Sequence, residues 1–166
     1  MSVFVVTVSS IIAWANYHNE PLPPQTKANL VVIEKSKRLL SLYSGNTLLK
    51  KYKVSLGRVP LGHKIREGDY RTPEGLYRID YRKSDSGYHK ALHISYPNET
   101  DIKAARRQGV SPGGAIMVHG MRNGFGWVGN MHQLVDWTAG CIAVTNWEID
   151  EIWQAVPDGT SIEIKP

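Results

Sequence analysis

The sequence contains one cysteine, Cys141, in the stretch DWTAGCIAV, and six histidines. A thiol attacks a carbonyl carbon as its thiolate, and the usual activating group is an imidazole that a third group holds in one tautomer. His119 follows the apolar run AIMV and precedes Gly120, so we expect a rigid strand end to hold its ring and to keep Cys141 as a thiolate near neutral pH. Gly140 precedes Cys141 and leaves the backbone N–H groups of both residues open to an oxyanion. These residue types suit acyl transfer, although an inert buried thiol and an unrelated hydrogen-bonded histidine explain the spacing equally well.

The elements that must position this pair are mostly strands. Alternating apolar residues and turn signals predict strands over residues 30–34, 39–43, 47–56, 76–82, 91–96 and 161–164, with AIMVHG as a buried strand that ends at His119. The stretch NETDIKAARRQG predicts a short helix that Asn98 or Thr100 caps, and TNWEIDEIWQAV predicts an amphipathic helix with Thr145 and Glu148 in capping-box spacing. Residues 57–75 predict a long loop of the kind that carries function. The sequence thus predicts one mainly β domain with two short helices.

The first 28 residues differ from this body. Residues 1–15 contain no charged side chain, and their apolar stretch has the length of a signal-peptide core, with Ala13 and Ala15 in the spacing of a cleavage site. A truncated signal or a plain N-terminal strand also fits, because the segment lacks a basic start. Residues 16–28 contain three prolines and predict an extended linker, which leaves residues 29–166 as the folded domain. We expect export, and in an oxidising compartment a lone cysteine is either hidden or used.

Composition excludes several classes of protein. The chain has 166 residues, of which 42% are hydrophobic and 21% charged, so it can bury a core and is neither disordered nor fibrous. Its net charge of +5 suits an anionic partner such as an acidic cell-wall polymer, but the basic residues are spread among apolar segments. We therefore expect no nucleic-acid partner.

Several stretches of this chain together resemble one family. The MVHG segment followed at a distance by TAGCIAV is similar to the signature of L,D-transpeptidase catalytic domains, cysteine enzymes of bacterial cell walls, and the loop KIREGDYRTPEGLYRI and the segments SLG and ISYPN match as well. The similarity extends from about Asn29 to Ile164. It implies a β-sandwich or barrel of mixed sheets and an acyl-enzyme that cuts the L-to-D bond after diaminopimelate in tetrapeptide stems of peptidoglycan. It implies Cys141 as nucleophile, His119 as base and the Gly120 carbonyl as the acceptor that orients the imidazole, with no cofactor and no metal.

The resemblance has departures that bear on the outcome of the reaction. Ala139 and Ala143 stand where the family often has a histidine and an arginine or asparagine, and the insert between His119 and Cys141 is longer than usual. The outcome is therefore crosslinking, attachment of a wall-bound acceptor protein, or hydrolysis by an L,D-carboxypeptidase or amidase type of reaction. In every case the partner is a peptidoglycan stem peptide, and we expect no stable membrane insertion of the catalytic domain.

Five further residues are candidates for substrate binding, each with a structural alternative: Arg71, Trp127, His132, Trp137 and Thr138. Arg71 can hold a substrate carboxylate or an ion pair within its loop. Trp127 and Trp137 can stack on sugar or cover an apolar edge, and Thr138 occupies a flanking position of the motif. His132 can replace His119 as the base or lie on the surface. His89 and His93 are expected to be structural or peripheral.

Two readings from other classes remain open. A zinc-dependent wall hydrolase would use His119, His132 and either Asp136 or Cys141, although no known zinc-ligand spacing is present. A catalytically inert wall-binding module is favoured by the two alanine departures.

Overall fold

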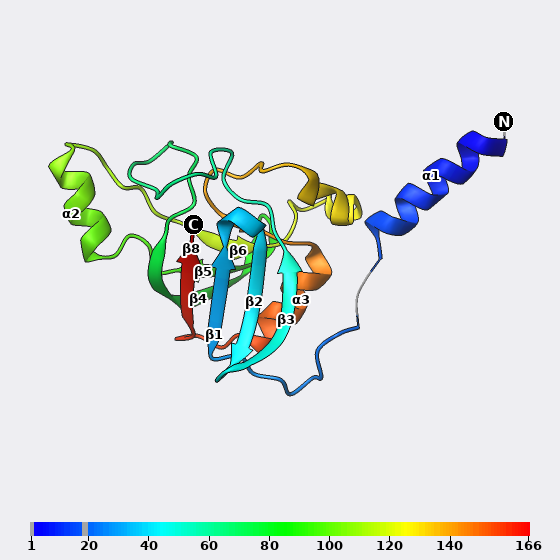
Figure 1. Ribbon diagram of the computed structural model, residues 1–166, viewed down its shortest axis with the longest axis horizontal. Helices are drawn as coiled ribbons and strands as arrows, with labels where there is room; N and C mark the ends of the chain where they lie inside the picture. The colour runs from blue at the N-terminus through cyan, green and yellow to red at the C-terminus, as the bar shows by residue number, and fades with distance from the viewer. Residues whose placement is uncertain (1, 18–19) are drawn as a thin grey trace.

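In the computed structural model, eight strands form one mixed sheet of order β3-β2-β1-β8-β4-β5-β6-β7 (Figure 1). The structure describes residues 2–17 and 20–166. The strands are β1 (Leu30–Glu34), β2 (Leu39–Ser44), β3 (Thr47–Lys53), β4 (Gly75–Ser86), β5 (His89–Ile94), β6 (Met117–His119), β7 (Ile142–Ala143) and β8 (Ser161–Lys165). The pairs β1–β8 and β6–β7 are parallel, and the others are antiparallel.

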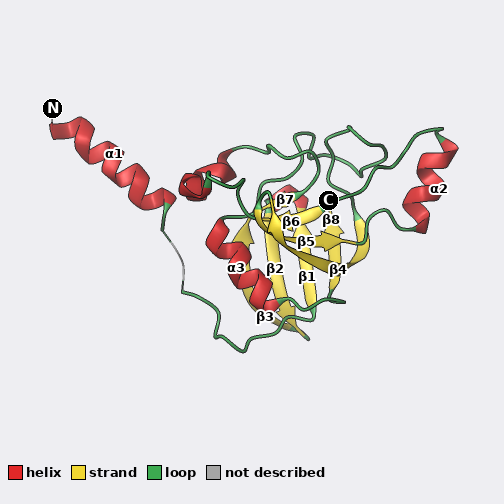
Figure 2. Ribbon diagram, turned by 180° about the vertical axis from the view of Figure 1, so that it is seen from behind, coloured by secondary structure: helices red, strands yellow, loops and turns green. Residues whose placement is uncertain are grey.

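The sheet curls at its long central strand. The first residues of β4, Gly75–Arg78, pair with β8, and the remainder, from Ile79 on, pairs with β5. The β1–β2–β3–β8 half therefore faces the β5–β6–β7 half, and one apolar core fills the space between them (Figure 2). Fully buried members from the two halves include Ile33, Leu40 and Ile94. The mainly β, mixed-sheet architecture predicted from the sequence is confirmed.

The two predicted helices form with the predicted caps. Helix α2 (Glu99–Arg107) begins at Asn98, whose side chain accepts hydrogen bonds from Thr100 N and Asp101 N. Helix α3 (Asn146–Ala155) begins at Thr145 with a complete capping box to Glu148. These side chains satisfy backbone N–H groups that a helix start leaves without partners. The apolar face of α3 packs on β5 and closes one side of the core.

Other helical segments were not predicted as such. Residues 2–15 form helix α1 (Ser2–Ala15), not a strand, and a 3-10 segment, η2 (Gly126–Leu134), occupies the insert between His119 and Cys141. A short 3-10 turn, η1 (Lys35–Lys37), replaces the predicted turn between β1 and β2. Met1 of the predicted hydrophobic segment and residues 18 and 19 of the predicted linker lie outside the described residues. Within the described part of the chain, every helix is too short or too polar to cross a membrane.

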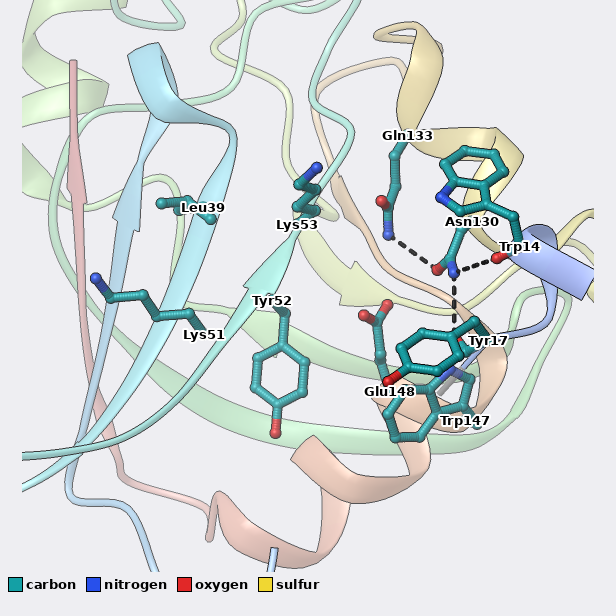
Figure 3. A pocket seen from close by; sticks show the side chains of 10 residues that line it. All are labelled: Trp14, Tyr17, Leu39, Lys51, Tyr52, Lys53, Asn130, Gln133, Trp147 and Glu148. Carbon is teal, nitrogen blue, oxygen red and sulfur yellow. Dashed lines mark hydrogen bonds between the residues drawn. The ribbon is translucent and has the colours of Figure 1, made fainter. Parts of the chain in front are cut away.

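The end of α1 packs against η2 (Figure 3). The Asn130 side-chain amide donates to the backbone oxygens of Trp14 and Tyr17 at 3.0 and 3.1 Å. Gly129 has φ +50, and a Cβ at that position would lie 2.0 Å from Ala15 O. Only glycine therefore allows this close approach of the two segments.

Candidate active site

His119 is the last residue of β6, a short strand between β5 and β7. Its backbone is fixed from both sides, because it pairs with Ala91 on β5 and with Ala143 on β7. The ring Nδ1 lies 2.7 Å from the Gly120 carbonyl oxygen. A carbonyl only accepts, so Nδ1 carries the proton of the neutral ring and Nε2 keeps a free lone pair. His119 is therefore in the tautomer that a general base at Nε2 requires.

The turn before Cys141 is held by Thr138. The Thr138 hydroxyl donates to Cys141 O at 2.8 Å and accepts from Gly140 N at 3.1 Å. Gly140 has φ +134, and a Cβ there would lie 2.7 Å from Arg71 O. Any other residue at position 140 would strain the backbone and push the Arg71 loop away.

This turn limits which backbone groups can stabilise an oxyanion. The Gly140 N–H already donates to Thr138, so of the two predicted donors the Cys141 N–H is the one that this hydrogen bond leaves available. The sequence could not show this, because the spacing of Thr138 and Gly140 does not reveal which group the hydroxyl contacts.

The Cys141 thiol is partly exposed and lies in the walls of two cavities. One, of about 470 Å³, also contains His119, Tyr88 and Trp137. The other, of about 440 Å³, contains Lys64 and Glu67, three glycines, and the apolar residues Ala115, Ile116 and Ala139. In the resting arrangement the thiol points to Ala115 O at 3.5 Å. The sulfur can therefore be approached from two sides.

Burial favours the uncharged form of both groups. It lowers the pKa of His119 below its usual value, against the opposing effect of the Gly120 carbonyl. It raises the pKa of Cys141, although a hydrogen bond from the Met117 backbone and the charge of Lys64 act in the other direction. The resting site therefore favours a thiol and a neutral imidazole over the thiolate expected from the sequence. A nucleophilic attack by this thiol would therefore require its proton to move from sulfur to nitrogen as the attack occurs.

Two aromatic rings enclose the imidazole. The Tyr88 and His119 ring centroids are 4.6 Å apart, and Trp137 meets His119 edge-on at 5.8 Å. Trp137 was a sequence candidate, whereas Tyr88 was missed. Tyr88 lies at the tip of the β4–β5 hairpin, in the segment DSGYH, and only the pairing of β5 with β6 brings it to His119. The sequence signal for Tyr88 is its position in a predicted turn between two strands, which does not by itself indicate a contact with His119.

The remaining candidates lie around this centre. His132 is buried, not on the surface, and its Nδ1 lies 3.1 Å from the Ser55 hydroxyl. Trp127 is exposed on η2 and lines neither cavity at Cys141. Arg71 contacts Gly140 through its backbone oxygen, and it is one of the residues that line a third cavity.

The groups considered for zinc are engaged elsewhere. Asp136 accepts from the Arg38 guanidinium at 2.8 and 3.1 Å and from Leu56 N at 2.9 Å. Residues 2–17 and 20–166 contain no group of three or more His, Cys, Asp or Glu side chains placed to hold a metal ion. His89 and His93 pair with Asp150 and Asp80 at 2.9 and 2.6 Å, outside both cavities.

Comparison with known proteins decides the family. The family model for the L,D-transpeptidase catalytic domain (YkuD) matches residues 28–164. The chain belongs to the L,D-transpeptidase family. An Escherichia coli K12 relative named "Putative L,D-transpeptidase YafK" is 36% identical over 132 residues, which are 76% of this chain and 46% of that protein. The L,D-transpeptidase family match thus includes both His119 and Cys141.

Solved structures of this family have the same fold. Pgp2 of Campylobacter jejuni, described as a helical cell shape determining protein, matches 95% of this chain and 55% of its own with a TM-score of 0.64 and 24% identity. L,D-transpeptidase 3 of Mycobacterium tuberculosis, solved with a faropenem-derived adduct, matches 84% of this chain and 60% of its own with a TM-score of 0.56 and 14% identity. The chain spans about half the length of YafK and of Pgp2.

Proposed function

We propose that this L,D-transpeptidase domain acts on peptidoglycan stem peptides through an acyl-enzyme on Cys141, with His119 as general base and acid. The observation that carries the proposal is the fixed tautomer of His119, a residue that lines the same cavity as Cys141, which holds the only thiol in the chain. The substrate bond is the L-to-D peptide bond after diaminopimelate in a tetrapeptide stem.

The first half of the reaction forms a thioester. The Cys141 sulfur attacks the carbonyl carbon as His119 Nε2 takes the thiol proton, and the Cys141 N–H donates to the developing oxyanion. The tetrahedral intermediate collapses as the C–N bond breaks, and His119 returns the proton to the leaving amine. The terminal D-amino acid departs, and the remaining stem stays on sulfur as a thioester.

The second half transfers the acyl group. An amine of an acceptor stem or of a wall-attached protein, or a water molecule, attacks the thioester while His119 takes its proton. The Cys141 thiolate leaves and takes that proton from His119. Two cavities that meet at the sulfur support transfer to a second substrate, because a donor can occupy one while the acceptor enters through the other.

The proposal places the enzyme in the cell envelope, reached by export, where its substrate is. Residues 1–15 act as the hydrophobic signal segment that directs export, and residues 29–166 act as the catalytic domain. Trp137 and Tyr88 form the apolar wall that holds the donor stem beside His119. Trp127 and His132 are proposed to affect substrate affinity from the η2 insert.

The test is incubation of the full chain with a purified disaccharide tetrapeptide, followed by mass spectrometry of the products. A crosslinked dimer indicates transpeptidation, and a disaccharide tripeptide with free D-amino acid indicates hydrolysis. Either product must disappear in the Cys141→Ala variant and persist in the presence of a chelator. Activity that survives Cys141→Ala but is lost to the chelator would replace this proposal with a metal-dependent hydrolase, and no turnover by the wild type would indicate a binding module.

A further inference from the structure

A third cavity, of about 580 Å³, lies beside the cavity of Cys141 that contains Lys64. The residues that line it include Arg66, Arg71 and Gln108, from the loop before β4 and the segment after α2. Its apolar wall consists of Val59, Ile65 and Val110. The lining therefore includes two arginines and a glutamine beside a small apolar surface.

The one carboxylate in this cavity is already fully engaged. Asp69 accepts from Lys64 Nζ at 2.8 Å and from the backbone N–H groups of Ile65, Arg66 and Arg71 at 2.8, 3.1 and 3.1 Å. Burial opposes the charge, but these donors lower the pKa of Asp69 to about 2. Asp69 thus stays ionised and organises the loop, and its oxygens face Lys64 and the backbone instead of a guanidinium.

The two arginines consequently lack an anionic partner. Across residues 2–17 and 20–166, no carboxylate oxygen lies within 4.0 Å of the guanidinium of Arg66 or Arg71. Among the described residues, the Arg71 guanidinium makes a single hydrogen bond, from Nη1 to the His63 backbone oxygen at the long distance of 3.5 Å. Two arginines in the lining of one cavity, with no carboxylate paired to either, favour an anion from outside the chain.

The cavity adjoins the reaction centre. Gly68 lines both this cavity and the one that contains Cys141. The Arg71 backbone oxygen packs on Gly140, directly before the nucleophile. An anion held by Arg66 and Arg71 would therefore lie within a short length of extended peptide from the thiol.

We propose that this cavity binds a free carboxylate of the stem peptide that reacts at Cys141. Arg66 and Arg71 hold the carboxylate, Gln108 donates a further hydrogen bond, and the apolar wall of Val59, Ile65 and Val110 contacts a small side chain beside it. The inference rests on the proposed function and adds a substrate subsite to it. Two stem carboxylates have this chemistry, the one at the C-terminus and the one on diaminopimelate.

The test measures binding of three tetrapeptide substrates to the full-length Cys141→Ala protein by calorimetry. The first has both carboxylates free, the second has a C-terminal carboxamide, and the third has a carboxamide on diaminopimelate. We expect one of the two carboxamides to bind about tenfold to a hundredfold more weakly than the free acid, because a charge-assisted hydrogen-bond pair is lost. The carboxamide that weakens binding identifies which carboxylate the cavity holds.

The variants Arg66→Gln and Arg71→Lys, made in the same protein, connect this preference to the cavity. Each must weaken binding of the free acid and reduce its advantage over the sensitive carboxamide, with an unchanged thermal unfolding midpoint. Arg71→Lys keeps the charge near His63 but loses the two-pronged contact with a carboxylate. Arg122→Gln is the matched control, since Arg122 is exposed and lines neither this cavity nor those at Cys141, and it must leave the preference intact.

Equal binding of the three substrates, or a preference that the arginine variants retain, would overturn the subsite. The proposed function stands in that case if the wild type still acylates Cys141. Absence of both binding and acylation with the free acid would overturn the proposed function and the subsite together.

Discussion

His119 and His132 are both buried, and burial lowers the pKa of each, to about 4 for His132. They differ in the hydrogen-bond partner of Nδ1 and in the surroundings of the rest of the ring. His119 donates from Nδ1 to the Gly120 carbonyl, and it lines a cavity together with Cys141. His132 is fixed by Ser55, whose hydroxyl donates to the His132 carbonyl at 2.7 Å and therefore accepts from Nδ1. Its Nε2 is buried without a hydrogen-bond partner.

The comparison shows that a fixed tautomer and a lowered pKa do not by themselves make a histidine catalytic. Both rings have these properties, but the structure gives only His119 a place in the cavity wall beside the thiol. His132 connects the η2 insert to Ser55, the residue that bridges to Ala143 on β7. We infer that His119 transfers protons, and that His132 holds the insert in place.

The largest expected effect separates the two rings directly. His119→Ala should slow acylation of Cys141 by a hundredfold or more, as expected for loss of a general base, whereas His132→Asn should change the rate by less than about fivefold. Asparagine keeps a donor where Nδ1 contacts Ser55. Single-turnover acylation with circular dichroism as a folding check measures both. A folded His132→Asn protein that is inactive, beside an active His119→Ala protein, would reverse the assignment.

The second prediction concerns acid stability. The pKa of His132 is about 4 in the folded protein and about 6.5 when unfolded, so the unfolded chain binds the proton more tightly. Above pH 6.5 His132 is neutral in both the folded and the unfolded protein, and it has no effect on the pH dependence of stability. As the pH falls from 6.5 towards 4, protonation of the unfolded chain lowers the free energy of unfolding by about 3 kcal/mol. Urea unfolding at pH 7 and pH 4 should show a smaller pH dependence for His132→Asn than for the wild type. An identical pH dependence in the two proteins would contradict this account of His132.

A third prediction sharpens the contrast between the nucleophile's turn and the insert. Thr138→Val should lower the acylation rate about tenfold, because it removes the hydroxyl that joins Gly140 N to Cys141 O and loosens the turn. Thr138→Ser retains the hydroxyl and should stay within about threefold of the wild type. The measurement is the acylation rate of the two variants, compared at equal thermal stability. Equal rates for both would show that the Thr138 hydroxyl does not contribute to acylation.

The smallest expected effect concerns the free thiol. Because burial raises the pKa of Cys141, iodoacetamide should react with it more slowly at pH 7 than with a free cysteine, whose pKa is about 8.5, and the rate should rise only above that value. His132→Asn should leave this profile unchanged. A rate that already reaches its plateau below pH 7 would indicate a resting thiolate and an ion pair with His119.

Every strand of the sheet except β7, both capped helices and the family could be predicted from the sequence, because alternation, capping residues and the MVHG and TAGC segments are local patterns. β7 has two residues, which is too short for alternation to reveal. The neighbours of His119 could not be predicted. Tyr88 reaches the imidazole only through the β4–β5–β6 pairing, and Ser55 reaches His132 only after β3 ends beside β7. Such contacts depend on the register of strands distant in sequence, which local patterns do not determine.

Charge states were equally inaccessible from the sequence. The pattern of Cys141 and His119 suggested an ion pair, but desolvation by the curled sheet makes the neutral forms more stable. Arg71 shows the same limit. Its sequence context could not reveal that Asp69 is engaged by Lys64 and backbone N–H groups, leaving the guanidinium without a carboxylate.

The most direct test of the account is rapid quenching of the full chain with the disaccharide tetrapeptide, followed by peptide mapping of the protein. The account predicts a thioester on the peptide that contains Cys141, formed at least a hundredfold more slowly in His119→Ala and at nearly the wild-type rate in His132→Asn. Products that accumulate without any adduct on Cys141, and that still form in Cys141→Ala, would contradict it.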